Sequence, residues 1–509
     1  MVNIEVGVYS GTGYPDGWLR ICEQEKMPHK VTDKPDSPVI VFEKETPEWL
    51  ADYLSEGGVA VITEAVPASL PFDSQYFGEG LTTELFFQGI QGVAYAPAMG
   101  SIFRGNGYGC FRLHEKRIAK NGISNGEFPV FLRKNVGRGC CFYTGLPLTK
   151  LLMCMGDTLR CFSPYTVVTE RVSAIDKSLI AGVLVEVLKK AFWAAGLPYV
   201  RLWYYPNGEP TMFAFRVDVD GVYGTHLTAI ARTAEEYKMP ISFFVNRSLC
   251  QGDESFIKAI SDFHEIGNHG DVHNLHDSLE DNISNIQQCS EWMRAEGISS
   301  GPWFVAPRGM WNWSLHQALE ALGYEYSSDF GLEFDGLPFF PRINNRRSSV
   351  LQIPIHPYSV ERAFAWSSEE NAPEPTSETV ADYFKKVVRD RLKNNLPAFF
   401  YGHPQYLGTM AHEVLPELMA AVTSLDIKTT TLTRFARWWL KRDATRYSVT
   451  WDEEDRQLVV DGTLLGSVYL NVLTEQLDLT VEGIAERQVM FTKADAANEY
   501  RYLRGGIDQ

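Results

Sequence analysis

Two short stretches of the sequence carry side chains that could bind a metal ion and activate water. Asp218 and Asp220 stand at the carboxyl end of a buried strand expected over 211–219. His269 and His273 stand four positions apart, just beyond the end of another expected element. One carboxylate and two imidazoles form a three-ligand site for a divalent metal ion, with positions left open for water and substrate. Because the other carboxylate is then free to act as a base on that water, these residue types predict a metal-dependent hydrolase of an amide.

The elements that must position these side chains alternate between strand and helix from residue 211 onward. Short apolar runs predict the strands, and apolar residues at helical spacing predict the helices between them. The expected strands cover 211–219, 240–245, 303–305, 349–354 and 398–402, and the expected helices cover 226–238, 256–263, 277–296, 314–322 and 377–394. Repeated β-then-α units favour parallel strands and a barrel, in which active residues gather at the carboxyl ends of the strands.

An α/β accessory domain is expected over residues 1–200, ahead of the barrel domain at 205–441. Its buried runs at 39–42 and 59–62, with a helix between them, are typical of parallel strands. This pattern resembles the class I glutamine amidotransferase-like fold. Active members of that fold need a Cys on a strand-to-helix elbow, and 59–66 contains none. We therefore expect no glutaminase chemistry in this domain.

A small β-rich domain is expected at the C-terminal end, over 446–509. The pattern there changes to alternation, and Asp461-Gly462 is a strong cue for a hairpin. A chain of 509 residues is too long for one ordinary core, so two or three domains are expected. The predicted fold class is α/β, with a distal antiparallel β appendage.

The charge balance excludes two classes of partner. The net charge is −17 at pH 7, whereas binding to nucleic acid or to an anionic membrane surface requires clustered Lys and Arg. The sequence shows neither a signal-peptide pattern nor an apolar run of about 18 residues. We therefore expect a cytoplasmic protein whose eight cysteines are reduced. Formation of a homo-oligomer stays open.

The histidine stretch carries a family pattern. Residues 264–269 read HEIGNH, His273 follows four residues on, and an Asp-x-Asp strand end at 218–220 precedes them. In this combination, residues 211 to about 410 resemble the NodB-type polysaccharide deacetylases of the carbohydrate esterase 4 superfamily. The resemblance implies a distorted (β/α)7 barrel and a hydrolase of carbohydrate metabolism that removes N- or O-acetyl groups from sugars.

The resemblance also implies a role for each residue of the two stretches. Asp220, His269 and His273 would hold the metal ion, and Asp218 would be the general base. Zn²⁺ is the expected ion, with Co²⁺, Ni²⁺ and Mn²⁺ as alternatives. The competing interpretations are that the carboxylates cap the following helix and that the imidazoles bond to backbone.

Two later positions match further motifs of the family. His403, in the run at 401–404, would be the general acid that protonates the leaving amine. Asp329, in the run at 326–329, would orient His403. The competing interpretations are a structural histidine and a simple turn cap.

The third motif, at 304–312, departs from the family pattern. The usual arginine that holds the catalytic Asp is replaced by Val305. Arg308 stands where a backbone N–H commonly helps to hold the oxyanion, and we expect its guanidinium to supply the missing charge to Asp218. The alternative is that Arg308 pairs with a carboxylate outside the site.

Three other histidines are considered as metal ligands. His276 and His356 are competing metal ligands, whereas His264 is expected to be structural.

Three functions are compatible with the sequence. The first function is removal of an acetyl group from an N-acetylated sugar, oligosaccharide or glycan precursor. The Asp-x-Asp form is similar to a branch with cyclic-amide hydrolases, so the second is hydrolysis of a non-sugar linear or cyclic amide. The third, kept open by Val305, is a catalytically silent binding protein.

Overall fold

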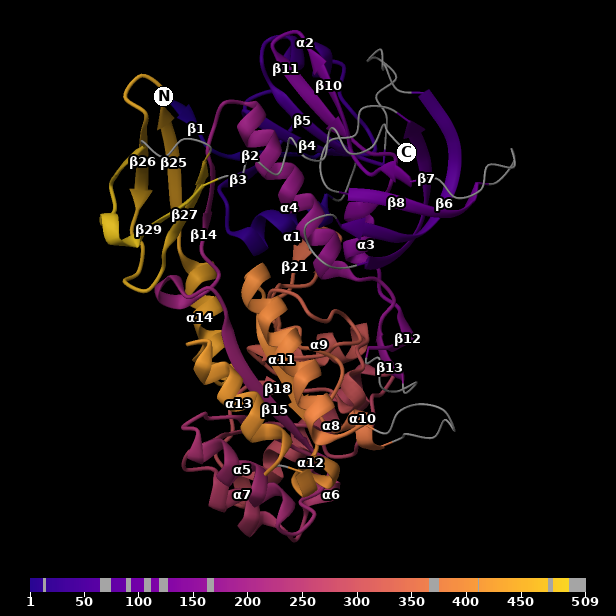
Figure 1. The fold of residues 1–509 in the computed structure, drawn as a ribbon, viewed down its shortest axis with the longest axis vertical. Coiled ribbons are helices and arrows are strands. Elements are labelled where there is room, and N and C mark those ends of the chain that lie inside the picture. The colour runs from indigo at the N-terminus through magenta and orange to yellow at the C-terminus, as the bar shows by residue number, and fades with distance from the viewer. Residues whose placement is uncertain are drawn as a thin grey trace.

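The computed structural model describes most of the chain. The described residues are 1–11, 15–64, 75–87, 93–104, 111–118, 127–162, 169–365, 375–410, 412–474 and 479–493. In Figure 1 the residues from about 212 to 444 form the lower part of the molecule, and the N-terminal unit and the C-terminal strands lie side by side above them. None of the helices in the described ranges is long and apolar enough to span a membrane.

The lower part is organised around a parallel sheet. Its strands are β15 (Met212–Val219), β16 (Ser242–Val245), β17 (Glu265–Asn268), β18 (Trp303–Phe304), β19 (Tyr326–Ser327), β22 (Leu351–Gln352), β23 (Ala398–Gly402) and β24 (Lys428–Thr429). Their order is β22-β19-β18-β17-β16-β15-β23, with β24 on β15, and every pair is parallel. All eight residues of β15 are buried, as expected for a strand covered on both faces.

The sheet is curled but not closed, which corrects the expected (β/α)7 barrel to a half-barrel. Among the described strands, β22 and β23 end the order and do not pair with one another. The strands expected from apolar runs are present as β15, β16, β18, β22 and β23. The structure adds β17, whose four residues lie inside the histidine motif itself.

Helices cover the sheet between successive strands. They are α5 (His226–Glu236), α6 (Arg247–Cys250), α7 (Glu254–Ile260), α8 (Leu279–Ala295), α9 (Trp313–Ala321), α10 (Arg362–Ala365), α11 (Ser377–Asn394), α12 (Pro404–Met410), α13 (Val414–Ser424) and α14 (Leu432–Ala444). Side-chain caps begin several of them: Ser278 accepts from the N–H of Asp281, and Asn312 from that of Leu315. The apolar faces of α5, α11 and α13 pack with the strands in one buried cluster.

The N-terminal unit is a second α/β layer structure. Its six-stranded sheet has the order β10-β11-β5-β4-β2-β3, parallel except for the β10–β11 pair. The strands are β2 (Val6–Tyr9), β3 (His29–Thr32), β4 (Val39–Glu43), β5 (Val59–Thr63), β10 (Leu132–Val136) and β11 (Gly139–Tyr143), and the helices are α1 (Asp16–Glu25), α2 (Leu50–Ser55), α3 (Leu148–Met153) and α4 (Lys177–Ala194). An antiparallel sheet that the sequence did not predict joins β6 (Gln75–Phe87), β7 (Val93–Arg104), β8 (Phe111–Ile118) and β9 (Glu127–Pro129).

One hairpin leaves the N-terminal unit and lies against the half-barrel. It consists of β12 (Asp157–Cys161) and β13 (Thr169–Ser173), which pair antiparallel. Figure 1 shows it at the right, beside α9 and α10. The 3-10 turn η2 (Pro307–Gly309), which follows β18, lies close to β13.

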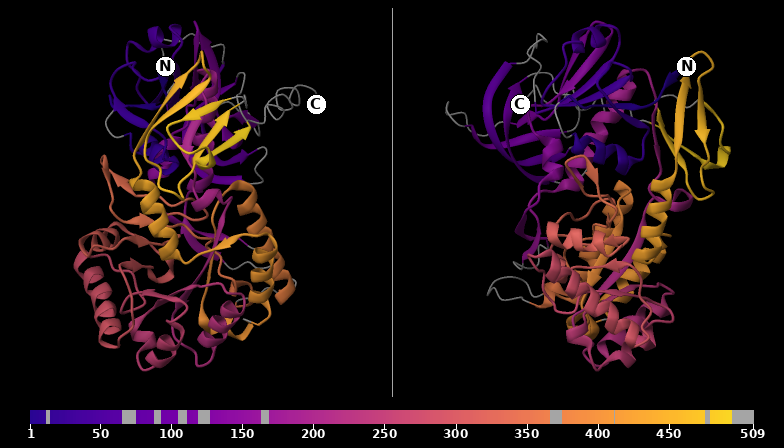
Figure 2. Two further views of the ribbon diagram at one scale, coloured as in Figure 1. Left: turned by 90° about the vertical axis from the view of Figure 1, so that its left-hand side faces the viewer. Right: turned by 180° about the vertical axis from the view of Figure 1, so that it is seen from behind.

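The C-terminal strands are completed by strands from the N-terminal unit. β25 (Tyr447–Asp452), β26 (Gln457–Gly462) and β28 (Thr480–Glu482) form a sheet whose edge strand is β1 (Val2–Asn3). β27 (Leu470–Thr474) pairs with β29 (Val489–Lys493) and with β14 (Tyr199–Leu202). Figure 2 shows these yellow strands against the N-terminal unit in both views. The predicted β appendage therefore shares its sheets with residues far away in the sequence.

Candidate metal and catalytic site

The predicted metal ligands come from two strands of the half-barrel that end at the same edge. Asp220 follows β15 directly, and His269 follows β17 directly. Both strands pair with β16 in parallel, so their carboxyl ends meet at one edge of the sheet. The structure thus brings together residues that stand 49 positions apart in the chain, as the sequence predicted.

Three side-chain atoms converge at this edge. The Nε2 atoms of His269 and His273 each lie 3.2 Å from Oδ1 of Asp220. All three atoms are buried, and they have no hydrogen-bond partner outside the cluster. Two buried imidazole nitrogens that converge on one carboxylate oxygen have the arrangement of ligands that share a cation. Across the described residues, this is the only group of three His, Cys, Asp or Glu side chains spaced for a metal ion. Its donor set of two imidazoles and one carboxylate fits a divalent ion.

Backbone contacts hold His269 in its place. Its side chain is fully buried, and Nδ1 lies 2.7 Å from the carbonyl oxygen of Val305. That contact leaves Nε2 as the atom that faces Asp220. A ring nitrogen bonded to a carbonyl fixes the orientation and tautomer of a metal-binding imidazole. Val305, which stands where an arginine was expected, therefore still helps to hold His269, through its backbone carbonyl group.

The turn between the two histidines depends on Gly270. Its φ is +86°, and a Cβ there would lie 2.8 Å from Nδ2 of Asn285. Oδ1 of Asn285 accepts hydrogen bonds from the N–H groups of Asp271 and Val272, both at 2.8 Å. The turn is thereby tied to α8, and it presents His273 on the same side as His269.

The charges around the cluster place two of the three ligands in their metal-binding states, whereas the pKa of His269 is raised, because Asp220 and Asp218 outweigh the lowering effect of burial. Burial raises the pKa of Asp220, but the contact with His269 and the neighbouring imidazoles lower it to about 2. Burial lowers the pKa of His273 to about 4. Asp220 is therefore ionised and His273 neutral near pH 7, which are the states in which these side chains bind a metal ion.

Arg216, and not Arg308, supplies the charge beside Asp218. Nε of Arg216 lies 2.7 Å from Oδ1 of Asp218, and Nη2 donates to Oδ2 at 2.8 Å. Both side chains are buried. Successive residues of a strand point to opposite faces, so Arg216 and Asp218 share a face of β15. This period of two is the signal with which the sequence could have identified Arg216.

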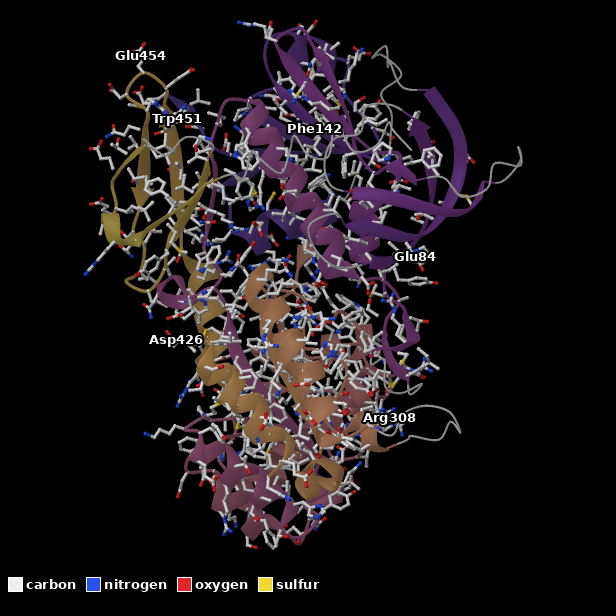
Figure 3. All side chains as sticks on the ribbon, in the orientation of Figure 1. Glu84, Phe142, Arg308, Asp426, Trp451 and Glu454 are labelled. Carbon is white, nitrogen blue, oxygen red and sulfur yellow. The ribbon has the colours of Figure 1, made fainter. Side chains whose placement is uncertain are left out.

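The expectation that Arg308 pairs with Asp218 is wrong. Arg308 is exposed, in the positive-φ conformation at +59°. Figure 3 shows it at the surface of the half-barrel. The pKa of His273 is lowered mainly by burial and by His269, and the positive charge of Arg308 adds a smaller lowering effect. Its backbone role towards an oxyanion stays a prediction.

His403 lies at the same edge of the sheet, directly after β23. Its Nδ1 lies 2.6 Å from Oε1 of Glu361, and its Nε2 lies 3.9 Å from Oδ2 of Asp220. Burial lowers the pKa of His403, but Glu361 raises it to about 9. Glu361 is buried, and the sequence reasoning missed it because 42 residues separate it from His403. No local motif connects the two.

Asp329 does not orient His403, because Glu361 does. Oδ1 of Asp329 accepts from the N–H of Ala306 at 2.9 Å, and Ser327 Oγ donates to Oδ2. Burial raises the pKa of Asp329 to about 6. Asp329 therefore fixes the segment after β18, which includes the Val305 carbonyl that holds His269.

The competing histidines have other partners. Nδ1 of His264 accepts from the N–H of Ile241 at 3.2 Å, which confirms its structural role. His356 contacts Asp335 at 3.0 Å and Tyr383 at 3.1 Å. Neither His276 nor His356 belongs to the metal-ligand group found among the described residues.

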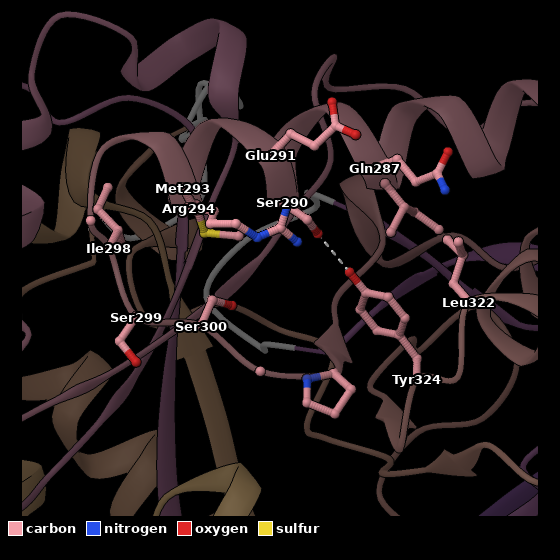
Figure 4. Close-up of a pocket in the computed structure, with 14 residues that line it drawn as sticks. Gln287, Ser290, Glu291, Met293, Arg294, Ile298, Ser299, Ser300, Leu322 and Tyr324 are labelled. Atoms are coloured by element: carbon pink, nitrogen blue, oxygen red, sulfur yellow. Dashed lines mark hydrogen bonds between the residues drawn. The ribbon is translucent and has the colours of Figure 1, made fainter.

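A surface cavity lies behind the histidine loop. Its volume is about 690 Å³, and Figure 4 shows Ser290 and Tyr324 in its wall, joined by a hydrogen bond of 3.0 Å. Both hydroxyls also contact Nδ2 of Asn268, at 2.8 and 3.1 Å. Oδ1 of Asn268 accepts from the N–H of Gly270 at 2.7 Å. This wall therefore supports the turn that carries the metal ligands.

One comparison assigns this region to a family. The sequence model described as Polysaccharide deacetylase matches residues 215–327. The matched span contains Asp218, Asp220, His269 and His273. Residues 215–327 therefore form a polysaccharide deacetylase domain of the carbohydrate esterase 4 type. The match does not reach the N-terminal unit, so its likeness to amidotransferases stays a prediction.

Solved structures show only a distant likeness. A protein from Mycobacterium smegmatis assigned to the polysaccharide deacetylases is 16% identical, with a TM-score of 0.42, over 49% of this chain and 96% of that one. A family 4 acetyl xylan esterase from Clostridium thermocellum with a cobalt ion is 14% identical, with a TM-score of 0.33, over 45% and 92%. A CE4 family pseudoenzyme from Bacillus anthracis is 14% identical, with a TM-score of 0.32, over 46% and 66%. Likenesses this distant carry no argument about activity. No curated protein matches the chain.

Proposed function

We propose that the protein is a metal-dependent hydrolase that removes an acetyl group from an N-acetylated sugar, oligosaccharide or glycan precursor. The observation that carries this proposal is the convergence of three buried ligand atoms of Asp220, His269 and His273, with the buried carboxylate of Asp218 near the end of the strand that Asp220 follows. The family of residues 215–327 supports a sugar as the substrate. The proposed location is the cytoplasm, which favours a soluble or carrier-linked precursor over a finished polymer.

Asp220, His269 and His273 would hold the ion, for which we propose Zn²⁺. When bound, a divalent ion supplies positive charge that polarises the acyl carbonyl and lowers the pKa of water towards about 7. The two imidazoles are oriented by the chain itself, since His269 is fixed by Val305 and His273 by the turn at Gly270. The site is thus preorganised before the ion enters.

Asp218 accepts the proton of the attacking water in this proposal. Arg216 contacts both of its oxygens, at 2.7 and 2.8 Å, and so fixes the plane of the carboxylate. A carboxylate offers about four lone-pair positions, so it can accept a proton while it is held by the guanidinium. The charge that is absent at Val305 is present at Arg216, which supports an active enzyme over a catalytically silent protein.

His403 donates the proton that lets the nitrogen leave. Glu361 holds Nδ1, so the opposite nitrogen, Nε2, faces Asp220 and the reaction centre. With its pKa raised to about 9, His403 is protonated near pH 7, as a general acid must be. Tyr401 packs edge-on against the ring, with centroids 5.4 Å apart.

Acetate release and metal content test the proposal together. The purified protein, loaded with Zn²⁺, Co²⁺, Ni²⁺ or Mn²⁺, is expected to release acetate from N-acetylglucosamine oligomers. His269→Ala should remove bound metal and activity, whereas Asp218→Asn should retain metal and lose at least about 100-fold in kcat. His276→Ala, a histidine outside the ligand group, is the matched control and should retain both.

Two results would decide against this function. Turnover only of linear or cyclic amides without a sugar would establish the second hydrolase hypothesis instead. A folded protein that binds none of the four ions, by elemental analysis, would remove the mechanism altogether.

A further inference from the structure

The β12–β13 hairpin brings a charged residue of the N-terminal unit to the edge of the candidate site. Glu170 lies on β13, and its Oε1 is 2.8 Å from Nε of Arg362. Nη2 of Arg362 also donates to the carbonyl oxygen of Thr169 at 3.3 Å. The side chain of Glu170 is only 12% exposed. Two contacts therefore join this strand to the first residue of α10.

Arg362 directly follows the residue that holds the proposed general acid. Glu361 contacts Nδ1 of His403 at 2.6 Å. The segment is anchored to the sheet before that point, because the N–H of Val360 donates to the carbonyl oxygen of Tyr401 at 3.1 Å. Beyond Glu361 comes α10, a single turn of four residues. So short a helix is not stable by itself and needs contacts from outside to keep its position.

We propose that Glu170 is a positioning residue for the general acid and acts through Arg362 on the Glu361–His403 pair. This inference rests on the proposed function and adds to it a residue from another unit of the chain. In this arrangement the hairpin keeps α10 in place, and α10 keeps Glu361 against the imidazole. Glu170 itself does not touch the reacting atoms.

Charge supports the same placement. Burial raises the pKa of Glu170 to about 7, while the positive charges of Arg362 and His403 lower it and Glu361 raises it further. The Glu170 carboxylate is therefore close enough to His403 and Glu361 for their charges to matter.

The hairpin does not need this ion pair to stay folded. Arg160 on β12 pairs with Asp176. Phe162 packs edge-on against Phe334, with centroids 5.5 Å apart, and the N–H of Ser173 donates to Phe330 at 3.1 Å. A variant that loses only the Glu170–Arg362 pair should therefore fold with the hairpin in place.

The test compares two substrates that differ in their need for a proton. An N-acetylated glucosamine oligomer has an amine leaving group that must be protonated, whereas 4-nitrophenyl acetate releases 4-nitrophenolate, which leaves as a stable anion without a proton. Glu170→Gln in the full chain should lower kcat on the oligomer about 10-fold, with KM and bound zinc unchanged. Turnover of the ester should stay within about 2-fold, because general-acid catalysis does not limit it.

A neighbouring ion pair on the same hairpin supplies the control. Arg171 lies 2.6 Å from Asp157, and both are exposed. Arg171→Gln should leave kcat on the oligomer unchanged. Arg362→Gln should reproduce the loss of Glu170→Gln, and the double variant should lose no more than either single one, because the two residues act as a unit.

The outcomes separate this inference from the proposed function. Wild-type protein that releases no acetate overturns the proposed function and this inference with it. Active wild-type protein, together with Glu170→Gln that keeps its full kcat on the oligomer, overturns the inference alone. A Glu170→Gln loss that comes with an equal loss of zinc, or with additive losses in the double variant, also overturns it, since the role is then structural.

Discussion

At the scale of single residues, the site depends on two charged side chains, Asp218 and His403, each of which is held by a partner of opposite charge. Asp218 is held by Arg216, and His403 is held by Glu361. Both partners are buried, and neither belongs to the motif residues that the family pattern identified. Removing one member of such a pair leaves the other buried without compensation, which costs far more than the pair contributes.

Arg216→Gln is expected to impair both stability and catalysis. The variant leaves the buried Asp218 carboxylate without its guanidinium, so the free energy of unfolding should fall by about 3 kcal/mol. kcat should fall about 100-fold because the base is no longer oriented. Chemical denaturation and acetate release measure the two effects. Arg308→Gln leaves the Arg216–Asp218 contact intact, and a larger loss for Arg308→Gln than for Arg216→Gln would show that this assignment is wrong.

Glu361→Gln is expected to shift the alkaline limb of the activity profile. The proposed general acid, His403, must be protonated, and the Glu361 charge raises its pKa to about 9 against the effect of burial, so activity should decline as pH rises through that region. Without that negative charge the imidazolium is less favoured, and the decline should begin at a lower pH. A pH profile of kcat checks the direction. An unchanged alkaline limb would show that His403 does not control it.

At the scale of elements, the turn after β17 brings the two histidines of the candidate metal site together. The turn needs the positive φ of Gly270 and the Asn285 side chain that accepts from two of its N–H groups. Asn268 fixes the start of the same turn through Ser290 and Tyr324. The loop is therefore held by Asn285 of α8 and by Asn268 at the end of β17.

Gly270→Ala is expected to weaken metal binding. A Cβ at 2.8 Å from Asn285 Nδ2 must displace the side chain that holds the turn, so zinc affinity should fall at least about 10-fold. Gly297→Ala is the matched control, because its φ is +69° and nothing lies within 4 Å of the added Cβ. It should cost about 1 kcal/mol of stability without changing the affinity. Equal zinc titration curves for both variants would contradict the role given to Gly270.

At the scale of the whole molecule, the half-barrel is joined to the N-terminal unit through a buried polar junction. Arg442 of α14 is fully buried and donates to the carbonyl oxygens of Leu202 and Trp203, both at 2.8 Å. Nearby, Glu25 of α1 lies 2.6 Å from Arg201 of β14. These contacts connect α14, α1 and β14, so the units share one interior.

Residues 205–441 expressed alone are expected not to form a stable domain. The fragment ends inside α14, before Arg442, and so loses the hydrogen bonds by which that residue ties the helix to Leu202 and Trp203. It also loses the Tyr204 carbonyl that accepts from Trp438 at 3.0 Å. Solubility and a thermal melt, compared with the full chain, measure the effect. A soluble fragment with a cooperative melt and bound zinc would contradict this account.

The sequence by itself determined the candidate metal ligands and the elements that carry them. Asp220 and His269 follow buried strands, and His273 follows His269 after a fixed spacing, so local pattern was sufficient to identify them. Arg216 also lay within reach of local reasoning, because it shares a strand face with Asp218.

Only the tertiary structure decided which residues support the site. Glu361 reaches His403 across 42 residues, and Glu170 reaches Arg362 across 192 by way of a hairpin from another unit. The sheet is a half-barrel because β22 and β23 do not pair, which no strand's own sequence reveals. The physical reason is that hydrophobic periodicity reports which face of an element is buried, whereas partners between distant segments are selected by the packing of the whole chain.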